Sequence, residues 1–310
     1  MNTPCFLSIL IAVHNGEETL ATTLDSIFAS LGDRQHQAEI IIINDASVDQ
    51  TQHIIDDYAT RYQQIIALQR NWRNVGKVRN EAVAMAKGDY ILMVDADDTL
   101  LAGALETRLQ ILTAQQPDIL LSRLIEVRSE SAIIPQSVAA SPCPLTQHQA
   151  ITRFLIHRDF QAHFIGQFFA RRLFDAYTFP DFICYEDTWL FPVMLMNSQK
   201  TLYSSTGFYL YHKRGQSLSA AITAEKIHCL VLATQQLDTV FPPRYRQLIA
   251  CHWLDIADRY ENELRSLPDY ALVQQRLAQI DSVRFLCNPM VRLSYKRKWL
   301  KVRRRFRKSR

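Results

Sequence analysis

The chain has 310 residues, of which 48% are hydrophobic, and this is enough for one large or two ordinary domains with a substantial core. Six scattered cysteines without a C-x-x-C pair argue against a zinc site or a disulfide framework and favour a reducing compartment. No apolar run approaches the roughly 18 residues of a membrane span, and the opening residues lack the basic segment of a signal peptide. The net charge is +4, but the last twenty residues hold eleven Lys and Arg and no acid. The first 290 residues therefore carry a net charge of 4 − 11 = −7, so the body is mildly acidic and the tail strongly basic.

Strand patterns and helix patterns alternate along the first 125 residues. Continuous apolar runs, typical of strands buried on both faces, predict strands at 6–13, 39–43, 65–68, 90–94 and 119–124. Apolar residues at helical spacing predict the intervening helices, at 20–31, 54–62, 81–86 and 101–112. A polar loop at 71–80 precedes the third helix, which Gly88 is expected to end. The alternation predicts an α/β fold with a doubly wound, mainly parallel sheet.

The second half of the chain changes from mixed to helical patterns. Residues 129–144 are rich in Ser, Pro and Ala and predict a loop, and residues 201–212 predict one or two strands. Helices are predicted at 146–157 and 188–196. From residue 220 onward the pattern is helical, with breaks near the Pro242-Pro243 pair and Pro268. A helical carboxyl-terminal part therefore follows the α/β part.

Polar clusters follow three of the predicted strands, at 14–17, 44–47 and 95–98. Ligands of parallel sheets bind beyond the carboxyl ends of the strands, so we expect the three clusters at one binding edge. The first strand is not followed by G-x-G-x-x-G, and the chain has no G-x-x-x-x-G-K-[ST] sequence. A classical dinucleotide fold and a P-loop are therefore both unsupported.

Asp95, Asp97 and Asp98 form the most acidic of these clusters. Side chains alternate along a strand, so Asp95 and Asp97 can point the same way if the extended geometry continues. Two carboxylates suit Mg²⁺ or Mn²⁺, and a diphosphate could complete the coordination shell. The alternative is a solvated acidic turn before a helix, with Asp98 or Thr99 as its cap.

Glu186 and Asp187 lie among aromatic and aliphatic residues, just before a predicted helix. Acids at a helix start are explained by favourable interaction with the helix dipole. A carboxylate with apolar neighbours also has a raised proton affinity, which suits a general base. The sequence alone leaves both explanations open.

Six short motifs occur in one order along residues 6–215. They are SILIAVHN at 8–15, IINDASVD at 42–49, RN at 79–80, GDYILMVDADD at 88–98, YED at 185–187 and YLYH at 209–212. Together they resemble the family 2 glycosyltransferases of the GT-A fold. The resemblance implies a nucleotide-sugar-dependent, inverting transferase with a GT-A domain at 1–218 (donor half 1–125, acceptor half 126–218). The residue patterns add a helical region at 219–290 and a basic amphipathic tail at 291–310.

The resemblance also implies roles for individual residues. Asp187 would deprotonate the acceptor hydroxyl, with Glu186 beside it. Asp97 would hold Mn²⁺ or Mg²⁺, while Asp95 would contact the metal or the ribose. His212 falls where some relatives place another metal or phosphate contact, although packing also explains a histidine at a strand end. The residues expected to contact the nucleotide sugar are Ala12, Val13, Asn15, Glu17, Asp45 (at the base, usually uracil), Arg79 (near the diphosphate), Asp95 and Ala96.

Three features depart from the family pattern. Asn44 stands where Asp is common, His14 replaces a frequent Tyr, and the loop at 71–80 fits the family's Asn-Gly-Arg-Asn pattern poorly. The chain also lacks the Q-x-x-R-W sequence and the membrane span that are usual in processive polymer synthases of this family. Addition of one or a few sugars is therefore expected.

The basic tail has one apolar helical face, formed by Val291, Tyr295, Trp299, Val302 and Phe306. Such a helix can lie in the headgroup region of an anionic membrane. The alternatives are a solvated basic end and a nucleic-acid-binding segment. The acidic body supplies no basic groove, so no nucleic-acid partner is expected.

The leading hypothesis is a sugar transferase that acts on a glycan or lipid-linked acceptor, such as a lipopolysaccharide or capsule precursor. The expected donor is a UDP-sugar, and the expected location is the cytoplasm, at the inner face of the plasma membrane. A non-catalytic nucleotide-sugar- or polyanion-binding protein on a degenerate GT-A fold is the alternative. A nucleotidyltransferase is less well supported because the chain shows no basic phosphate-binding loop.

Overall fold

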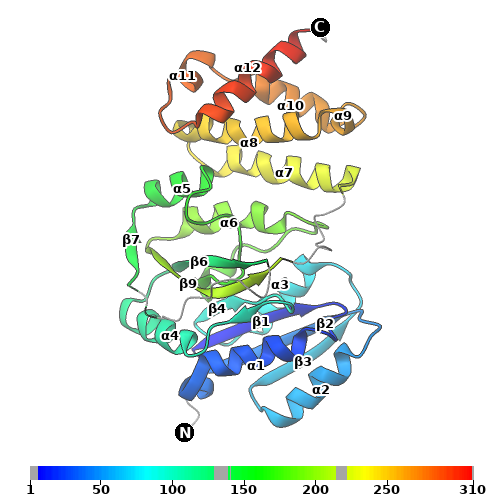
Figure 1. Ribbon diagram of the computed structural model, residues 1–310, viewed down its shortest axis with the longest axis vertical. Helices are drawn as coiled ribbons and strands as arrows, with labels where there is room; N and C mark the ends of the chain where they lie inside the picture. Colours follow the sequence, from blue (N-terminus) through cyan, green and yellow to red (C-terminus); the bar gives the residue numbers. More distant parts are fainter. Residues whose placement is uncertain (1–5, 129–138, 140, 214–221, 309–310) are drawn as a thin grey trace.

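The computed structural model describes residues 6–128, 139, 141–213 and 222–308, with side chains up to residue 305. In this part of the chain one nine-stranded sheet lies below a layer of helices (Figure 1). The spatial order of the strands is β3-β2-β1-β4-β8-β6-β9-β5, with β7 beside β9. Their bounds are β1 Leu7–Val13, β2 Ala38–Asp45, β3 Ile65–Arg70, β4 Tyr90–Met93, β5 Thr99–Leu100, β6 Ile119–Val127, β7 Cys143–Leu145, β8 Phe168–Ala170 and β9 Thr201–His212.

The centre of the sheet is parallel, as predicted. β1 pairs in parallel with both β2 and β4, and β2 pairs in parallel with β3. Every residue of β2 and β4 is buried, which explains their unbroken apolar pattern. Val13 lies opposite Asn44, and Leu10 lies opposite Met93. The polar clusters that follow β1, β2 and β4 therefore meet at one edge of the sheet.

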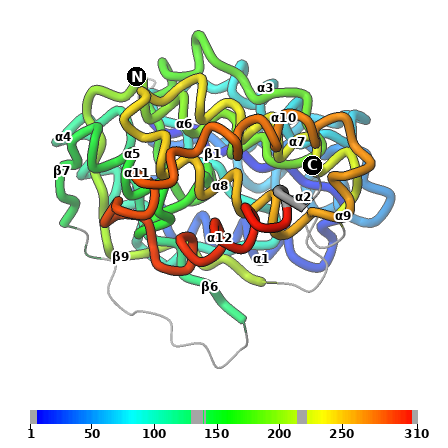
Figure 2. The backbone as a smooth tube through the Cα atoms, turned by 90° about the horizontal axis from the view of Figure 1, so that it is seen from above, coloured from blue at the N-terminus to red at the C-terminus, as the bar shows by residue number. Residues whose placement is uncertain are grey.

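Helices cover both faces of this sheet. Helices α1 (Leu20–Leu31) and α3 (Val75–Met85) lie on opposite sides of β1 (Figure 2). Helix α1 buries the apolar side chains that the sequence pattern assigned to its inner face. The other helices of the α/β part are α2 Thr51–Arg61, α4 Ala104–Gln115, α5 Gln147–Leu155, α6 Glu186–Asn197 and the short 3₁₀ helices η1 Gly32–Gln37 and η2 Arg171–Phe174.

The third helix begins earlier than predicted. The sequence pattern placed a loop at 71–80 and a helix from 81, but α3 begins at Val75. Asn74 caps the helix, because its side-chain oxygen accepts a hydrogen bond from the Lys77 N–H at 2.9 Å. A Cβ at Gly76 would lie 2.6 Å from the Pro180 carbonyl oxygen, so glycine permits the close approach of α3 to that segment.

The residues after the acidic cluster also differ from expectation. Thr99 and Leu100 form β5, which pairs antiparallel with β9, so neither Asp98 nor Thr99 caps a helix. The helix expected from 101 begins at Ala104. β9 is one continuous strand. Of the loop predicted at 129–144, residues 129–138 and 140 lie outside the described residues, and its last two residues belong to β7.

The carboxyl-terminal part is helical, as predicted. Its elements are α7 Ala224–Val240, η3 Pro243–Tyr245, α8 Arg246–Arg259, α9 Glu261–Leu264, α10 Asp269–Ala278, α11 Ser282–Cys287 and α12 Leu293–Lys308. The predicted breaks are confirmed, since α7 ends before the Pro242-Pro243 pair and α10 begins directly after Pro268. None of the helices in the described ranges is both long and apolar enough to cross a membrane.

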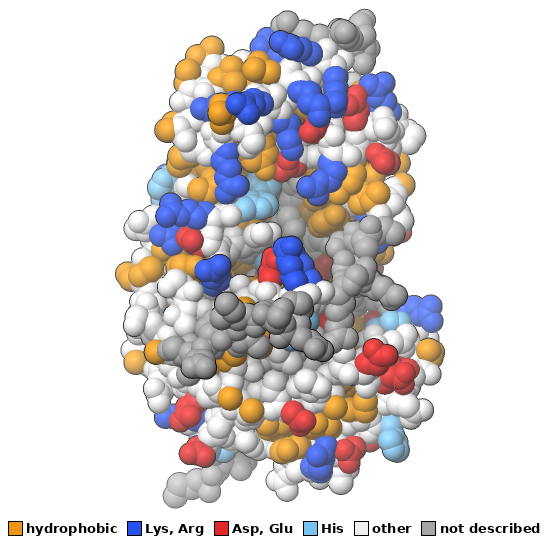
Figure 3. All heavy atoms as spheres, viewed as in Figure 1, with side chains coloured by type: hydrophobic (Ala, Val, Ile, Leu, Met, Phe, Trp, Pro, Cys, Tyr) orange, Lys and Arg blue, Asp and Glu red, His pale blue; other side chains and the backbone are white. Residues whose placement is uncertain are grey.

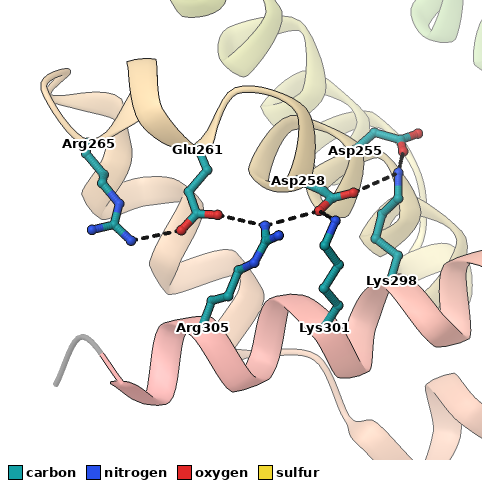
Figure 4. Close-up of polar contacts among 7 residues, drawn as sticks. All are labelled: Asp255, Asp258, Glu261, Arg265, Lys298, Lys301 and Arg305. Carbon is teal, nitrogen blue, oxygen red and sulfur yellow. Dashed lines mark hydrogen bonds and ion pairs between the residues drawn. The ribbon is translucent and has the colours of Figure 1, made fainter.

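Helix α12 packs against α8, and this corrects the prediction for the tail. Val291, Trp299 and Val302 are buried in the core, and Tyr295 donates a hydrogen bond of 2.6 Å to Asp255 Oδ2. The face expected to enter a membrane is therefore covered by protein at these four positions, and the Phe306 side chain lies outside the described residues. Several basic side chains of α12 pair with acids of α8 and α9 (Figure 4).

Candidate active site

Three aspartates meet at the carboxyl edge of the sheet, directly after β4. One carboxylate oxygen from each of Asp95, Asp97 and Asp98 can be chosen so that all three atoms lie within 4.8 Å of one another. Asp95 and Asp97 are partly exposed, whereas Asp98 is buried. The structure thus brings together the two carboxylates expected to bind metal and adds Asp98 to them.

Asp98 anchors the acidic turn to β9. Its Oδ2 accepts a hydrogen bond of 2.7 Å from the Tyr209 hydroxyl, and its Oδ1 accepts one of 2.8 Å from the His212 N–H. The Tyr209 oxygen in turn accepts a 3.0 Å bond from the Asp95 N–H. Burial, together with the charge of Asp95, raises the pKa of Asp98 to about 8.

The main chain of the turn is also fixed by the start of α1 and by Thr19, which precedes it. The Thr19 and Thr23 hydroxyls donate to the Ala96 carbonyl oxygen at 2.8 and 2.9 Å. Thr23 also lies 2.8 Å from the Asp98 carbonyl oxygen. The carboxylates of Asp95 and Asp97 therefore project from a turn held by both α1 and β9.

The chemistry of this donor set fits a hard divalent cation. All three groups offer carboxylate oxygens, which Mg²⁺ and Mn²⁺ prefer. Asp98 already uses both oxygens within the protein, so Asp95 and Asp97 are the residues that would hold an ion. Among the described residues, the cluster with metal-ligand proximity does not include His212, whose Nε2 lies 2.8 Å from the Thr99 hydroxyl. A metal contact by His212 stays a prediction.

Arg79 links this cluster to the two acids at the start of α6. Its Nη1 lies 2.8 Å from Glu186 Oε1 and 2.6 Å from Asp187 Oδ1, and its Nη2 lies 3.5 Å from Asp95 Oδ1. The Arg79 side chain is only 8% exposed, so these pairs are largely shielded from water. The resemblance assigned Arg79 to the diphosphate; in this conformation its guanidinium faces three carboxylates, and the diphosphate contact stays a prediction.

The acids around Arg79 hold their protons more tightly than exposed carboxylates do. Burial and the charge of Asp187 raise the pKa of Glu186, although Arg79 opposes the shift. Burial also raises the pKa of Asp187, where Arg79 lowers it and Asp95 raises it again. The Asp187 side chain is more exposed than that of Glu186, at 18% against 10%. Asp187 is therefore more accessible to solvent than Glu186 is.

The backbone before α6 positions this pair. Tyr185, which precedes the helix, has the left-handed φ of 66°, an uncommon conformation for a residue with a side chain. Helix α6 begins at Glu186, two residues before the predicted start, so both acids lie in its first turn and interact favourably with its dipole. The Phe164 N–H lies 3.4 Å from Asp187 Oδ2.

The predicted nucleotide residues of the first cluster join two loops. Asn15 Oδ1 accepts from the Val48 N–H, and Glu17 Oε2 accepts from the Gln50 N–H, both at 2.9 Å. Among the other predicted residues of this strand end, Ala12 is partly exposed and Val13 is buried. These contacts fix the shape of the edge; contact of these residues with a nucleotide stays a prediction.

Asp45 fixes the main chain of the segment that precedes α3. Its two carboxylate oxygens accept hydrogen bonds from the Trp72 N–H at 2.6 Å and the Asn74 N–H at 2.9 Å. The His14 Nδ1 lies 2.7 Å from the Asp45 carbonyl oxygen. Asp45 thus holds the short segment before α3, and a bond to a nucleobase would use its remaining lone pairs.

Tyr209 and Asn74 are the residues that sequence reasoning missed. Tyr209 joins Asp95 to Asp98, and the Asn74 amide donates to Asp181 Oδ1 at 2.7 Å, which ties the start of α3 to the segment before α6. Tyr209 stands in the YLYH motif, but only the strand register shows that its hydroxyl reaches the turn. Asn74 was hidden because the pattern predicted a loop where a capped helix begins.

The sheet and the helical layer have the GT-A fold, in which the acidic cluster lies at the carboxyl edge of the parallel strands. The chain aligns with the crystal structure of Staphylococcus aureus TarS 1-349 in complex with UDP-GlcNAc, with a TM-score of 0.71, 19% identity and coverage of 98% of this chain and 92% of that chain. It also aligns with the Pyrobaculum calidifontis mannosyltransferase PcManGT, in complex with GDP-Man and Mn²⁺ (TM-score 0.59, 14% identity, 97% and 87% coverage). At these identities the likeness shows the fold.

The sequence comparison gives the family. The family model described as Glycosyl transferase family 2 matches residues 8–177, more than half of the chain, so the chain belongs to this family. A Bacillus spizizenii poly(ribitol-phosphate) beta-glucosyltransferase is 32% identical over 134 residues, 43% of this chain and 21% of that protein. Glycosyltransferase GlyA of Streptococcus pneumoniae is 23% identical over 241 residues, 76% of this chain and 34% of that protein. The chain thus spans between a fifth and about a third of these relatives.

Proposed function

We propose that this chain transfers a hexosyl or N-acetylhexosaminyl group from a UDP-sugar to a hydroxyl of a glycan or lipid-linked acceptor, with inversion and with metal assistance, in surface polysaccharide synthesis. The observation that carries the proposal is the link from Asp187 through Arg79 to Asp95, which joins an acceptor-side base to the donor-side acids. The UDP-GlcNAc in the TarS structure and the poly(ribitol-phosphate) relative support the donor and acceptor classes.

The chemistry follows from the charges of the cluster. Asp187 takes the proton of the acceptor hydroxyl as the oxygen attacks the anomeric carbon, and the nucleotide diphosphate leaves from the opposite face. The new bond forms on the face of the anomeric carbon opposite the bond that breaks, so one displacement inverts the centre. Burial raises the proton affinity of Asp187, and Arg79 keeps its charged form accessible. A divalent ion held by Asp95 and Asp97 would neutralise charge on the diphosphate.

The test is UDP release from UDP-GlcNAc and UDP-glucose with and without Mn²⁺. We expect Asp187→Asn to retain UDP binding and to lose roughly 10²–10⁴-fold in rate, the scale for removing a general base. The matched control is Asp57→Asn, which removes an exposed carboxylate of α2 that pairs with Arg61. Normal turnover by Asp187→Asn would assign the base to another residue, with Glu186 the next candidate.

Asp97→Ala tests the metal assignment separately. The variant should fold, because Asp97 is partly exposed, and should lose transfer together with the Mn²⁺-dependent part of UDP affinity. Calorimetric titration of UDP with and without Mn²⁺ measures this part directly. Wild-type affinity in the variant would remove Asp97 from the site. Mn²⁺-dependent binding without UDP release by the unaltered chain would instead favour the non-catalytic alternative.

The proposed location is the cytoplasmic face of an anionic membrane, which the chain would contact through the exposed side of α12. Leu293, Arg297, Leu300 and Arg304 are exposed, at helical spacing. Lys and Arg side chains also gather over the helical part of the face in Figure 3. Each basic residue near such a surface contributes on the order of 1 kcal/mol, less at high salt.

Vesicle sedimentation tests this location. Arg297→Gln with Arg304→Gln should reduce pelleting with phosphatidylglycerol vesicles at low salt, and Leu300→Ser should reduce the part that survives high salt. Phosphatidylcholine vesicles serve as the uncharged control. Equal pelleting of the variants and the unaltered chain would contradict a membrane role for α12.

A further inference from the structure

Trp72 is an exposed aromatic residue at the carboxyl edge of the sheet. It lies two residues after the end of β3 at Arg70, and it is 40% exposed. Single exposed apolar side chains are normal on protein surfaces, so exposure alone indicates no function. Trp72 differs in its place, because ligands of parallel sheets bind beyond the carboxyl ends of the strands.

The main chain around Trp72 is held in one conformation. Asp45, the last residue of β2, accepts hydrogen bonds from the Trp72 N–H at 2.6 Å and from the Asn74 N–H at 2.9 Å. Arg73, between them, has a left-handed φ of 49°, which is uncommon for a residue with a side chain. The fixed main chain presents the indole ring at a defined point of the edge. Tryptophan also has few rotatable bonds, so binding to it costs little conformational entropy.

Arg70 lies over the ring of Trp72. The central carbon of its guanidinium is 5.7 Å from the ring centroid. Glu81 of α3 holds this guanidinium, with 2.8 Å between Arg70 Nε and Glu81 Oε2. One cation covers only one face of an indole, so the exposed part of the ring stays available for a second flat group.

The position of Trp72 relative to the acidic cluster restricts what that flat group can be. Trp72 follows β3, Asp95 and Asp97 follow β4, and the strand order between them is β3-β2-β1-β4. Three strand spacings separate the two positions by roughly 14 Å. A nucleoside diphosphate with its phosphates at the two acids is long enough for its base to reach Trp72.

We infer that the indole ring of Trp72 stacks on the nucleobase of the donor, on the part of the ring that Arg70 leaves open. The inference rests on the proposed function, because it takes the ligand to be a nucleotide sugar whose diphosphate lies at Asp95 and Asp97. It adds a binding residue that none of the six sequence motifs contains. Stacking requires a flat ring and no particular pattern of hydrogen-bond donors, so Trp72 contributes affinity for a base and does not choose among bases.

Calorimetric titration of the full chain with UDP and with inorganic pyrophosphate, both with Mn²⁺, tests the stacking, because pyrophosphate lacks the base. We expect Trp72→Leu to weaken UDP roughly 5–100-fold, the scale of base–aromatic stacking, and to leave pyrophosphate unchanged. Trp72→Phe should keep most of the UDP affinity, since a phenyl ring also stacks. The matched control is Tyr177→Leu, which removes a ring of similar exposure, 37%, that contacts Asn197 at the end of α6.

Tryptophan fluorescence gives a second readout. The chain has four tryptophans, and a base stacked on Trp72 should quench part of their emission as UDP is added. Trp72→Phe should abolish this quenching although the variant still binds UDP. Quenching that persists in Trp72→Phe would show that another tryptophan responds to UDP, contrary to the inference.

The remaining outcomes separate the inference from the proposed function. Unchanged UDP affinity in Trp72→Leu, or equal losses for UDP and pyrophosphate, would exclude stacking on the base. A loss for UDP-GlcNAc without a loss for UDP would assign the ring to the sugar instead. UDP binding that depends on Trp72, without UDP release by the unaltered chain, would support the stacking and contradict the proposed transfer. If the unaltered chain binds neither UDP nor GDP, both are wrong.

Discussion

The acidic edge of the sheet and the contact between α8 and α12 both contain ion pairs, but the surroundings of those pairs differ. At the edge, Arg79 faces Asp95, Glu186 and Asp187, and its side chain is 8% exposed. At the helix contact, Lys301 pairs with Asp258 at 2.8 Å while its side chain is 53% exposed (Figure 4). A buried charge is costly without its partner, whereas an exposed charge is solvated by water and screened by salt even when it is unpaired.

The two regions also differ in what stabilises them. One guanidinium cannot balance three carboxylates, so the edge keeps residual negative charge, and burial raises the pKa values of Glu186 and Asp187. Such a site is suited to bind a cation and to take up a proton. The helix contact instead obtains its stability from apolar burial, with Trp299 and Val302 in the core and the ion pairs around them.

Arg79→Met is expected to give the largest change in stability. The variant leaves three carboxylates without their shared cation, and breaking a buried pair in this way costs about 3–5 kcal/mol. Chemical denaturation measures the change in the free energy of unfolding. The carboxylates would bind protons more readily, so the loss should be smaller at pH 5 than at pH 8.

The matched control for this variant is Arg61→Met. Arg61 pairs with Asp57 at 2.8 Å on the surface of α2, with a side chain that is 48% exposed. A loss well under 1 kcal/mol is expected there. If the two arginine variants lose the same stability, the contrast between the two kinds of ion pair is wrong.

The sheet and the location of the site could be predicted from the sequence because both depend on local patterns. Unbroken apolar runs mark strands buried on both faces, and polar residues mark where those strands end, so Asp95 and Asp97 were found without the structure. The start of α3 was missed because its cap, Asn74, also suits a loop, and Gly76 weakens the helical pattern.

The links between segments could not be predicted in this way. Arg79 contacts Glu186 and Asp187 across more than a hundred positions, and Tyr209 reaches the acidic turn only through the register of β9 with β5. The tail shows the same limit, because an apolar helical face predicts burial but not whether protein or lipid covers it. In this chain protein covers Trp299 and Val302.

Trp299→Ala should produce the next largest effect, about 3 kcal/mol, because a large side chain that is buried against Phe285 is replaced by a cavity. Removal of the whole tail should therefore destabilise the helical part. Trp299→Phe is the matched control. The Trp299 Nε1 is buried without a hydrogen-bond partner, so phenylalanine removes an unsatisfied donor and should cost less than alanine. Equal losses in denaturation would show that the ring does not contribute through packing.

Lys301→Gln should have the smallest effect. Asp258 contacts three cations, because Arg305 Nη1 lies 3.3 Å from it and Lys298 Nζ lies 3.9 Å from it, so loss of Lys301 leaves the acid paired. An exposed pair contributes about 0.2–1 kcal/mol, and the remaining partners should reduce the loss to the lower end of that range. Denaturation in low and high salt measures it, and the difference from the unaltered chain should shrink as salt rises. A loss above 2 kcal/mol that salt does not change would mean that this network behaves like the buried cluster around Arg79.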